Sequence, residues 1–292
     1  MEPKVEFAKV RDFGEIISDT FLFVRENFKP LLSAFFTFCG IFLVAAAITG
    51  IMNQFKLADI YRNPDFASNG PGRLFGIQYF LTLLFSLLSI TAMTVTTLAY
   101  IALYKEKGNI TPTNEEIWGY FKYYYLKILG SALLTLILLI IGFVFCFIPG
   151  IYLYPILSLI FPIMIIENTS LGYAFSKSFK LIKDNWWLTF GSLFIIGLIV
   201  GIASGIATAP FSVGTFIDTI LNPQKGIQIS KTMAVAAVIV GQICHALYIL
   251  PMVTLALCYF SANESKEGTG LLDRINQLGN NDADNNLPAE EY

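Results

Sequence analysis

The chain has 292 residues, of which 55% are hydrophobic and only 14% carry a charge. A typical soluble domain has about 25% charged residues, so this composition excludes an ordinary soluble protein and indicates one that lies in a membrane. The formal net charge of −2 gives no reason to expect a nucleic-acid partner.

An amphipathic stretch, residues 13–28, precedes the first long apolar run. Its apolar residues recur at helical spacing and predict a helix that lies in the membrane interface. Asp12 and Glu15 can form a capping box at its start. The apolar face consists of Phe13, Ile16, Ile17, Phe21, Val24 and Phe28. Both charge signs occur before the apolar run begins at Leu31, so we expect an uncleaved insertion signal rather than a signal peptide.

Gaps between charged residues mark the membrane spans. A helix needs about 20 apolar residues to cross the hydrocarbon core, and four of the gaps hold one span each. The gap from Lys127 to Glu167 is longer, and the turn signal Pro149-Gly150 predicts a tight hairpin of two spans there. The predicted spans are about 31–54, 75–103, 128–147, 150–167, 187–208 and 232–260. Pro155 and Pro162 predict a kink or tilt in the fourth.

The distribution of basic residues predicts the orientation. With the amino terminus, the 105–127 loop, the 168–186 loop and the carboxyl tail on one side, that side holds 14 of the 19 Lys and Arg residues. Basic residues favour the cytoplasmic side. We therefore expect a multi-pass protein of the bacterial cytoplasmic (inner) membrane with both termini in the cytoplasm.

A second amphipathic stretch, residues 171–186, matches the first with an offset of 158 residues. Gly14, Ser18, Phe21 and Asn27 correspond to Gly172, Ser176, Phe179 and Asn185, and the apolar positions Leu171, Phe175, Phe179 and Trp186 recur in register. Asn168, Thr169 or Ser170 can cap this helix. A weaker copy, offset by 100 residues from the first, comprises Ile117, Phe121, Tyr124 and Ile128, with Thr113 and Glu116 as its cap.

Each amphipathic stretch precedes two predicted spans. The chain therefore divides into three units, at about 11–104, 111–167 and 168–260, each an interfacial amphipathic helix followed by a transmembrane hairpin. This predicts an all-α integral membrane domain over residues 1–262, with all three amphipathic helices on the cytoplasmic side. The alternative is that helices preceding spans converge on one pattern without common origin. Residues 263–292 are predicted to be a mostly disordered cytoplasmic tail.

Small residues recur every fourth position in the fifth span, and this spacing lets a neighbouring helix approach closely. The fifth span carries Gly197, Gly201 and Gly205, and the sixth offers Ala237 and Gly241. We expect these residues to pack inside the bundle. A homodimer seam is the alternative interpretation.

Polar residues within the spans are candidate functional groups. His245 and Gln242 share a face of the sixth span, and Glu167-Asn168 ends the fourth. We expect His245 to form an interhelical hydrogen bond with Gln242 or a facing hydroxyl, and Glu167-Asn168 to cap the next helix. A polar pathway that also uses second-span hydroxyls is the alternative; these are Ser86, Ser89, Thr91, Thr94, Thr96 and Thr97.

No motif of hydrolytic, nucleotide-binding or metal chemistry occurs in the chain, so neither a metal nor another cofactor is expected. The four cysteines lie in apolar runs and are expected to be small buried hydrophobes. They are Cys39, Cys146, Cys244 and Cys258.

Residues 147–194 carry several marks of one bacterial family: Pro149-Gly150, the pair Glu167-Asn168, the region of Ser178, and Trp186. "DFGEIISDTFLFVRENF" near the start and "SKEGTGLLDRI" after the last span also fit. The chain resembles the membrane domain fused to some bacterial glycerophosphodiester phosphodiesterases, and freestanding multi-pass relatives of unknown function, over most of residues 11–275. The soluble phosphodiesterase barrel and its acidic and histidine motifs are absent. The resemblance therefore implies the membrane fold without phosphodiesterase activity, and supplies no catalytic residues.

These observations predict a non-catalytic scaffold or accessory subunit of a membrane complex. Its expected partners are the lipid bilayer, other membrane proteins and, in the alternative above, a second copy of itself. A small transporter or channel for a lipid-like or neutral solute is the second hypothesis. A membrane enzyme acting on lipid head groups is the third, with Glu167 and His245 as its candidate residues.

Overall fold

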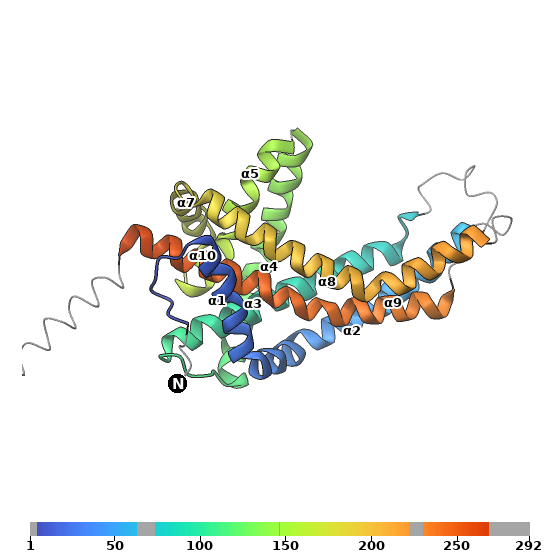
Figure 1. Cartoon of the computed structure of the whole chain (residues 1–292), viewed down its shortest axis with the longest axis horizontal. Helices are drawn as coiled ribbons and strands as arrows, with labels where there is room; N and C mark the ends of the chain where they lie inside the picture. Colours follow the sequence, from blue (N-terminus) through green and yellow to red (C-terminus); the bar gives the residue numbers. More distant parts are fainter. Residues whose placement is uncertain (1–4, 63–73, 146, 222–229, 269–292) are drawn as a thin grey trace, which may run out of the picture.

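The computed structural model describes residues 5–62, 74–145, 147–221 and 230–268 (Figure 1). Over these residues it is entirely helical, and six segments are long and apolar enough to cross a membrane. They are Phe28–Ile60, Ile77–Glu106, Asn114–Phe145, Phe147–Ile166, Trp186–Gly214 and Lys231–Glu267. The predicted all-helical class and the predicted number of membrane-length segments are confirmed.

The helices follow the chain in this order: α1 Phe13–Glu26, α2 Phe28–Arg62, α3 Ile77–Glu106, α4 Asn114–Phe145, α5 Phe147–Ser158, α6 Ile160–Ile166, α7 Leu171–Ile182, α8 Trp186–Leu221, α9 Lys231–Cys244, a short 3₁₀ helix η4 His245–Tyr248, and α10 Ile249–Glu267. In Figure 1, α2, α3, α8 and the α9–α10 pair run along the long axis of the molecule. The α4–α5 hairpin stands out from them at a steep angle. Its base is buried and its tip is exposed, with Val144 78% and Phe145 85% accessible.

The turn of this hairpin lies earlier than predicted. α4 ends at Phe145 and α5 begins at Phe147, so Pro149 and Gly150 lie in the first turn of α5. Proline is tolerated there because the first N–H groups of a helix have no intrahelical acceptor. Gly150 instead permits close packing: a Cβ at this position would lie 2.5 Å from the ring of Phe143. Pro149 therefore lies at the start of α5, and Gly150 provides a packing contact with α4.

Two spans are interrupted. The fourth breaks at Leu159, between α5 and α6, which confirms the predicted kink around Pro155 and Pro162. The sixth, predicted as one helix, is broken between Cys244 and Ile249 by η4. Pro251 accounts for this break, because it cannot donate to the carbonyl four residues earlier and its ring clashes with that turn.

The segments that we expect on the cytoplasmic side meet at one end of the molecule. The ring of Phe7 lies 5.0 Å from that of Phe260 and 6.1 Å from that of Tyr104, and the backbone N–H of Arg11 donates to Ser261 Oγ at 2.9 Å. The amino-terminal segment is thereby fixed to the ends of α3 and α10. Helix α10 continues to Glu267, five residues into the predicted tail, and the tail beyond Gly268 lies outside the described residues.

Candidate functional site

Helices α1 and α7 correspond to the two outer amphipathic stretches, and each is separate from the span that follows it. α1 begins with the predicted capping box: Glu15 N donates to Asp12 Oδ1 at 2.8 Å, and Asp12 N donates to Glu15 Oε2 at 3.1 Å. α7 begins at Ser170 without a side-chain cap. Three residues at corresponding positions are buried in both helices: Ile16, Thr20 and Phe23 in α1, and Ala174, Ser178 and Leu181 in α7.

Of the remaining apolar positions, Ile182 is also buried, whereas several aromatic ones face outward. Exposed rings form a row on each: Phe13, Phe21 and Phe28 beside α1, and Phe175 and Phe179 on α7. Ile17, Leu171 and Trp186 are partly buried, and the Trp186 indole donates to the carbonyl of Tyr152 at 3.0 Å. Each helix therefore packs on the bundle with one side and exposes aromatic side chains with another.

Both helices end with the same hydrogen bond. The Nδ2 of Asn27 donates to the carbonyl of Phe23 at 3.0 Å, and the Nδ2 of Asn185 donates to the carbonyl of Leu181 at 3.2 Å. These donors and acceptors are 158 residues apart, which is the offset between the two stretches. The shared asparagine thus places an additional side-chain hydrogen bond at the end of each helix, and at Asn27 the backbone N–H donates to the same Phe23 carbonyl.

The middle copy differs from the outer two. Thr113 and Glu116 do start a helix, with Thr113 N donating to Glu116 Oε2 at 2.8 Å, but α4 then runs unbroken through the predicted third span. Ile117, Phe121, Tyr124 and Ile128 are all buried. The prediction of a separate interfacial helix here is wrong, because this apolar face packs against the bundle and no stop signal interrupts the helix.

Glu167 and Asn168 hold three helices together at the end of the fourth span. Tyr259 of α10 donates to Glu167 Oε1 at 2.5 Å, and Lys177 of α7 lies 2.8 Å from the same oxygen. Tyr124 of α4 donates to Asn168 Oδ1 at 2.8 Å. Asn168 has a φ of 50°, a left-handed conformation that asparagine adopts more readily than most residues. The pair is therefore a junction between helices; it does not cap α7, whose N-cap position is occupied by Ser170.

Lys177 joins this junction to the last turn of α10. Its Nζ also lies 2.8 Å from Glu267 Oε1, and its side chain is only 12% exposed. Burial by itself would lower the pKa of Lys177, but the hydrogen bonds to Glu167 and Glu267 outweigh it and raise the pKa above the ordinary 10.5. Lys177 therefore remains charged at neutral pH between two carboxylates.

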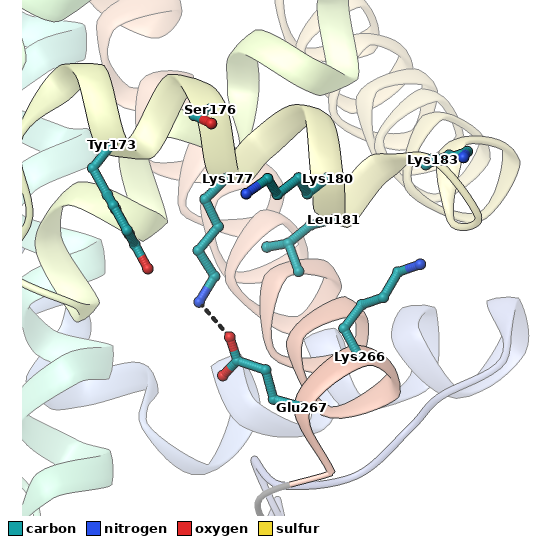
Figure 2. A pocket seen from close by; sticks show the side chains of 8 residues that line it. All are labelled: Tyr173, Ser176, Lys177, Lys180, Leu181, Lys183, Lys266 and Glu267. Carbon is teal, nitrogen blue, oxygen red and sulfur yellow. Dashed lines mark hydrogen bonds and ion pairs between the residues drawn. The ribbon is translucent and has the colours of Figure 1, made fainter.

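A basic groove opens between α7 and the last turn of α10, next to Lys177 (Figure 2). Its volume is about 510 Å³, and Lys266 on its far side is ion-paired to Asp184, whose pKa this contact lowers. The lining residues are Tyr173, Ser176, Lys177, Lys180, Leu181, Lys183, Lys266 and Glu267. We call it the α7–α10 groove. Four lysines line it, and three carboxylates (Glu167, Glu267 and Asp184) pair with two of them, so the groove keeps a small excess of positive charge.

His245 and Gln242 lie elsewhere in the molecule. Fourteen residues separate His245 from Tyr259, the α10 residue that reaches Glu167, which corresponds to about 20 Å along the helix. The Nδ1 of His245 lies 3.0 Å from the carbonyl of Gly241, so its hydrogen bond is made within its own helix and not with Gln242 as predicted. Gln242 Oε1 is buried without a hydrogen-bond partner among the described residues. The four predicted polar residues thus form two separate groups.

The small residues of the fifth span do not pack inside this chain. No atom of another element lies within 4 Å of the position that a Cβ would take at Gly197, Gly201 or Gly205, and all three are exposed on α8. Gly241 is open in the same way, and Ala237 is partly buried. At the contact between α2 and α9, by contrast, a Cβ at Gly50 would lie 3.4 Å from Val238 Cγ1.

The second-span hydroxyls mostly satisfy their own helix. Thr91, Thr94 and Thr96 donate to carbonyls four residues earlier at 2.8–2.9 Å. Such bonds cost a helix little. No group of His, Cys, Asp or Glu able to hold a metal ion occurs in the part of the chain that the structure describes. Cys39 and Cys258 are buried and Cys244 is partly buried, whereas Cys146 lies outside the described residues.

Sequence reasoning missed the buried cation Arg11. Its side chain is fully buried, its Nε donates to Asp19 Oδ2 at 2.8 Å, and its guanidinium also donates to backbone carbonyls of the amino-terminal segment. The spacing of Arg11 and Asp19, two turns apart across a helix start, is the only signal that could have suggested the pair.

Comparison with known proteins gives no match: no family model, no curated protein and no solved structure matches the chain. The resemblance to the membrane domain of glycerophosphodiester phosphodiesterases therefore stays a prediction.

Proposed function

We propose that this chain is a non-catalytic multi-pass protein of a bacterial cytoplasmic membrane that acts as a scaffold or accessory subunit of a membrane complex. The observation that carries the proposal is the common construction of α1 and α7. Both are separate helices, and each buries one side in the bundle and exposes a row of aromatic rings at the same end of the molecule. A helix of this kind suits the membrane interface or a partner helix.

The proposal includes the tandem organisation, with the middle unit modified. The matching burial of Thr20 and Ser178 and the matching hydrogen bonds of Asn27 and Asn185 support a common plan for the outer units. The middle unit keeps its cap but fuses its amphipathic helix to the span. The excess of Lys and Arg at the end where the amino-terminal segment contacts the end of α10 supports a cytoplasmic position for α1 and α7.

The polar residues of the spans support a structural role. Glu167 and Asn168, which are the strongest candidates for chemistry at the membrane boundary, are engaged by Tyr259, Lys177 and Tyr124. Carboxylate, amide, ammonium and phenol groups here satisfy one another between helices. A rigid junction of this kind positions α7 on the bundle, as a scaffold requires.

Purification of the tagged full chain in mild detergent tests the proposal. We expect a partner that is retained by the native chain and released by the double variant Phe175→Ala/Phe179→Ala, whose rings lie 5.0 Å apart on the exposed row. The matched control is Val144→Ala/Ile202→Ala, which removes similar exposed apolar area elsewhere. Recovery of only a lone monomer, or equal release by the control, contradicts the scaffold role.

The orientation has its own test. Single cysteines placed at the exposed positions Glu115, Lys180 and Asp59 are labelled with a membrane-impermeant maleimide in intact cells and in inverted vesicles. We expect Glu115→Cys and Lys180→Cys to react only in inverted vesicles, and Asp59→Cys only in intact cells. Labelling of Glu115→Cys and Lys180→Cys from opposite sides of the membrane would contradict the prediction that both positions lie on the cytoplasmic side.

One observation favours the transporter hypothesis for a lipid-like solute. An apolar groove of about 330 Å³ lies beside the break in the sixth span. Its lining includes Val24 and Phe28 on one side and Ile243, Ala246 and Leu247 on the other. Movement of a fluorescent lipid between the leaflets of proteoliposomes, blocked by the groove-filling variant Ala246→Trp, would support this function. No movement with the native chain would eliminate it.

A further inference from the structure

We propose that the α7–α10 groove binds the phosphate headgroup of an anionic phospholipid of the cytoplasmic leaflet. The proposal rests on the placement of α7 at the membrane surface, which is part of the proposed function, and adds a specific ligand to it. Its starting point is a set of four lysines that line one open volume, two from α7, one from the turn that follows it and one from α10 (Figure 2).

Two of these lysines are available for a ligand. Lys177 is held between Glu167 and Glu267, and Lys266 is paired with Asp184. Lys180 and Lys183, by contrast, are exposed and form no ion pair with any residue that the structure describes. Lysine ammonium groups bind phosphate as mobile point charges. The groove thus holds two lysines without an ion pair on the α7 side, of which Lys183 lies beside Asp184 and helps to lower the pKa of that carboxylate.

Neutral donors complete the polar lining. Tyr173 and Ser176 line the same groove; each lies within about one turn of Lys177 on α7, and Tyr173 is seven residues from Lys180. Hydroxyl groups beside lysines add hydrogen bonds to phosphate oxygens. A phosphate ester therefore fits this lining better than a carboxylate, because it offers more acceptor oxygens to cations and hydroxyls together.

A neighbouring groove with a largely apolar lining points to a lipid as the source of the phosphate. Lys183 and Asp184 line this second groove, of about 390 Å³, together with Trp187, Ile148 and Tyr152. Trp187 is 79% exposed and Ile148 is 73% exposed. A ligand that spans both grooves would place its phosphate near Lys180 and Lys183 and its hydrocarbon against the indole and Ile148. Only an amphipathic molecule uses both surfaces.

Quenching of tryptophan by brominated lipids tests the proposal on the full chain. The variant Trp118→Phe leaves only Trp186 and Trp187, which adjoin the second groove. In nanodiscs we expect brominated phosphatidylglycerol to quench at a lower mole fraction than brominated phosphatidylcholine. The variant Lys180→Gln/Lys183→Gln should raise the mole fraction of phosphatidylglycerol for half-maximal quenching about 30-fold, as expected for two lysines near an anionic surface.

The control removes the same charge from the same end of the molecule. Lys29→Gln/Lys122→Gln changes two exposed lysines outside the groove, and it should leave the preference intact. Equal loss in the control, or no loss in the groove variant, overturns the lipid site, since general electrostatics would then account for the preference. Thermal unfolding of each variant in detergent shows that the fold is retained.

Two further outcomes separate this proposal from the others. Displacement of phosphatidylglycerol by millimolar inorganic phosphate would show a site for free phosphate and overturn the lipid assignment. If neither brominated lipid quenches the fluorescence, α7 lies away from the membrane. This result would contradict both the lipid site and the proposed placement of α7 at the membrane surface. Quenching without headgroup preference contradicts the lipid site alone.

Discussion

The side-chain amides of Asn27 and Asn185 make the same hydrogen bond, each to the carbonyl four residues earlier, although the residues are 158 positions apart in the chain. The two side chains differ in the hydrogen bonds that their Oδ1 atoms accept. Asn27 is buried, and its Oδ1 accepts from the hydroxyl of Tyr100 at 2.8 Å. One local signal thus serves two different tertiary environments.

This difference predicts unequal costs for the same substitution. Asn27→Ala removes both bonds and leaves the Tyr100 hydroxyl buried without its acceptor, so it should lower the free energy of unfolding by about 2–3 kcal/mol. Asn185→Ala should lower it by only about 1 kcal/mol. Unfolding by SDS titration in mixed micelles measures both values. Equal losses would show that the Tyr100 contact contributes nothing.

Loss of the Glu167 carboxylate should release α7 and α10 from the end of the fourth span. Glu167→Ala removes the acceptor of Tyr259 and one of the two anions at Lys177, and should cost about 1–3 kcal/mol, reduced from the value for a fully buried pair because both side chains are partly exposed. Glu167→Gln keeps an acceptor and should cost less. The exposed Glu115→Gln is the control, with an expected change within about 0.5 kcal/mol. The midpoint of thermal unfolding in detergent ranks the three variants.

The raised pKa of Lys177 leads us to expect that the folded protein loses stability at alkaline pH. Because its pKa is raised in the folded state, its contribution is complete below the ordinary value of 10.5 and is lost as the pH rises through the higher folded value. Unfolding is compared for the native chain and Lys177→Met at neutral pH and at pH 10–12, roughly the range in which lysine titrates. The stability difference between them should shrink over that range. A constant difference would mean that packing, and not charge, accounts for the role of Lys177.

Two glycines should respond in opposite ways to alanine. Gly150→Ala places a Cβ against the ring of Phe143, so it should lower stability by about 1–3 kcal/mol through overpacking in the α4–α5 hairpin. Gly201→Ala meets no other element and should leave the monomer as stable or slightly more stable. The unfolding midpoint of the monomer tests both. A large loss at Gly201 would contradict the open position of this glycine on α8.

Several local features were predictable from the sequence because their signals are short-range. The capping boxes at Asp12 and Thr113, the kink at Pro155 and Pro162, and the number of membrane-length helices depend on residues within one or two turns of each other. The turn of the α4–α5 hairpin was placed wrongly, because Pro149-Gly150 is compatible both with a turn and with a first helical turn. The break at His245 was missed, although Pro251 was a sufficient signal for it.

The contacts of the candidate site could not be predicted in the same way. Lys177 and Glu267 are 90 residues apart, and Tyr259 and Glu167 are 92 apart, so only the packing of α6, α7 and α10 could show that they meet. The apolar pattern of the middle amphipathic stretch likewise could not show what this helix face contacts. Periodicity shows that Ile117 and Phe121 share a helix face, but not whether that face covers protein or lipid.

The sequence alone therefore determined that this chain is helical, apolar over six membrane-length segments, and built around amphipathic stretches, since each property follows from composition and near neighbours. The tertiary structure decided which faces are buried, where the fourth and sixth spans meet α7, and that four lysines surround one groove. The physical reason is that lipid and protein interiors are equally apolar, so hydrophobicity cannot distinguish a face that contacts a helix from one that contacts the bilayer.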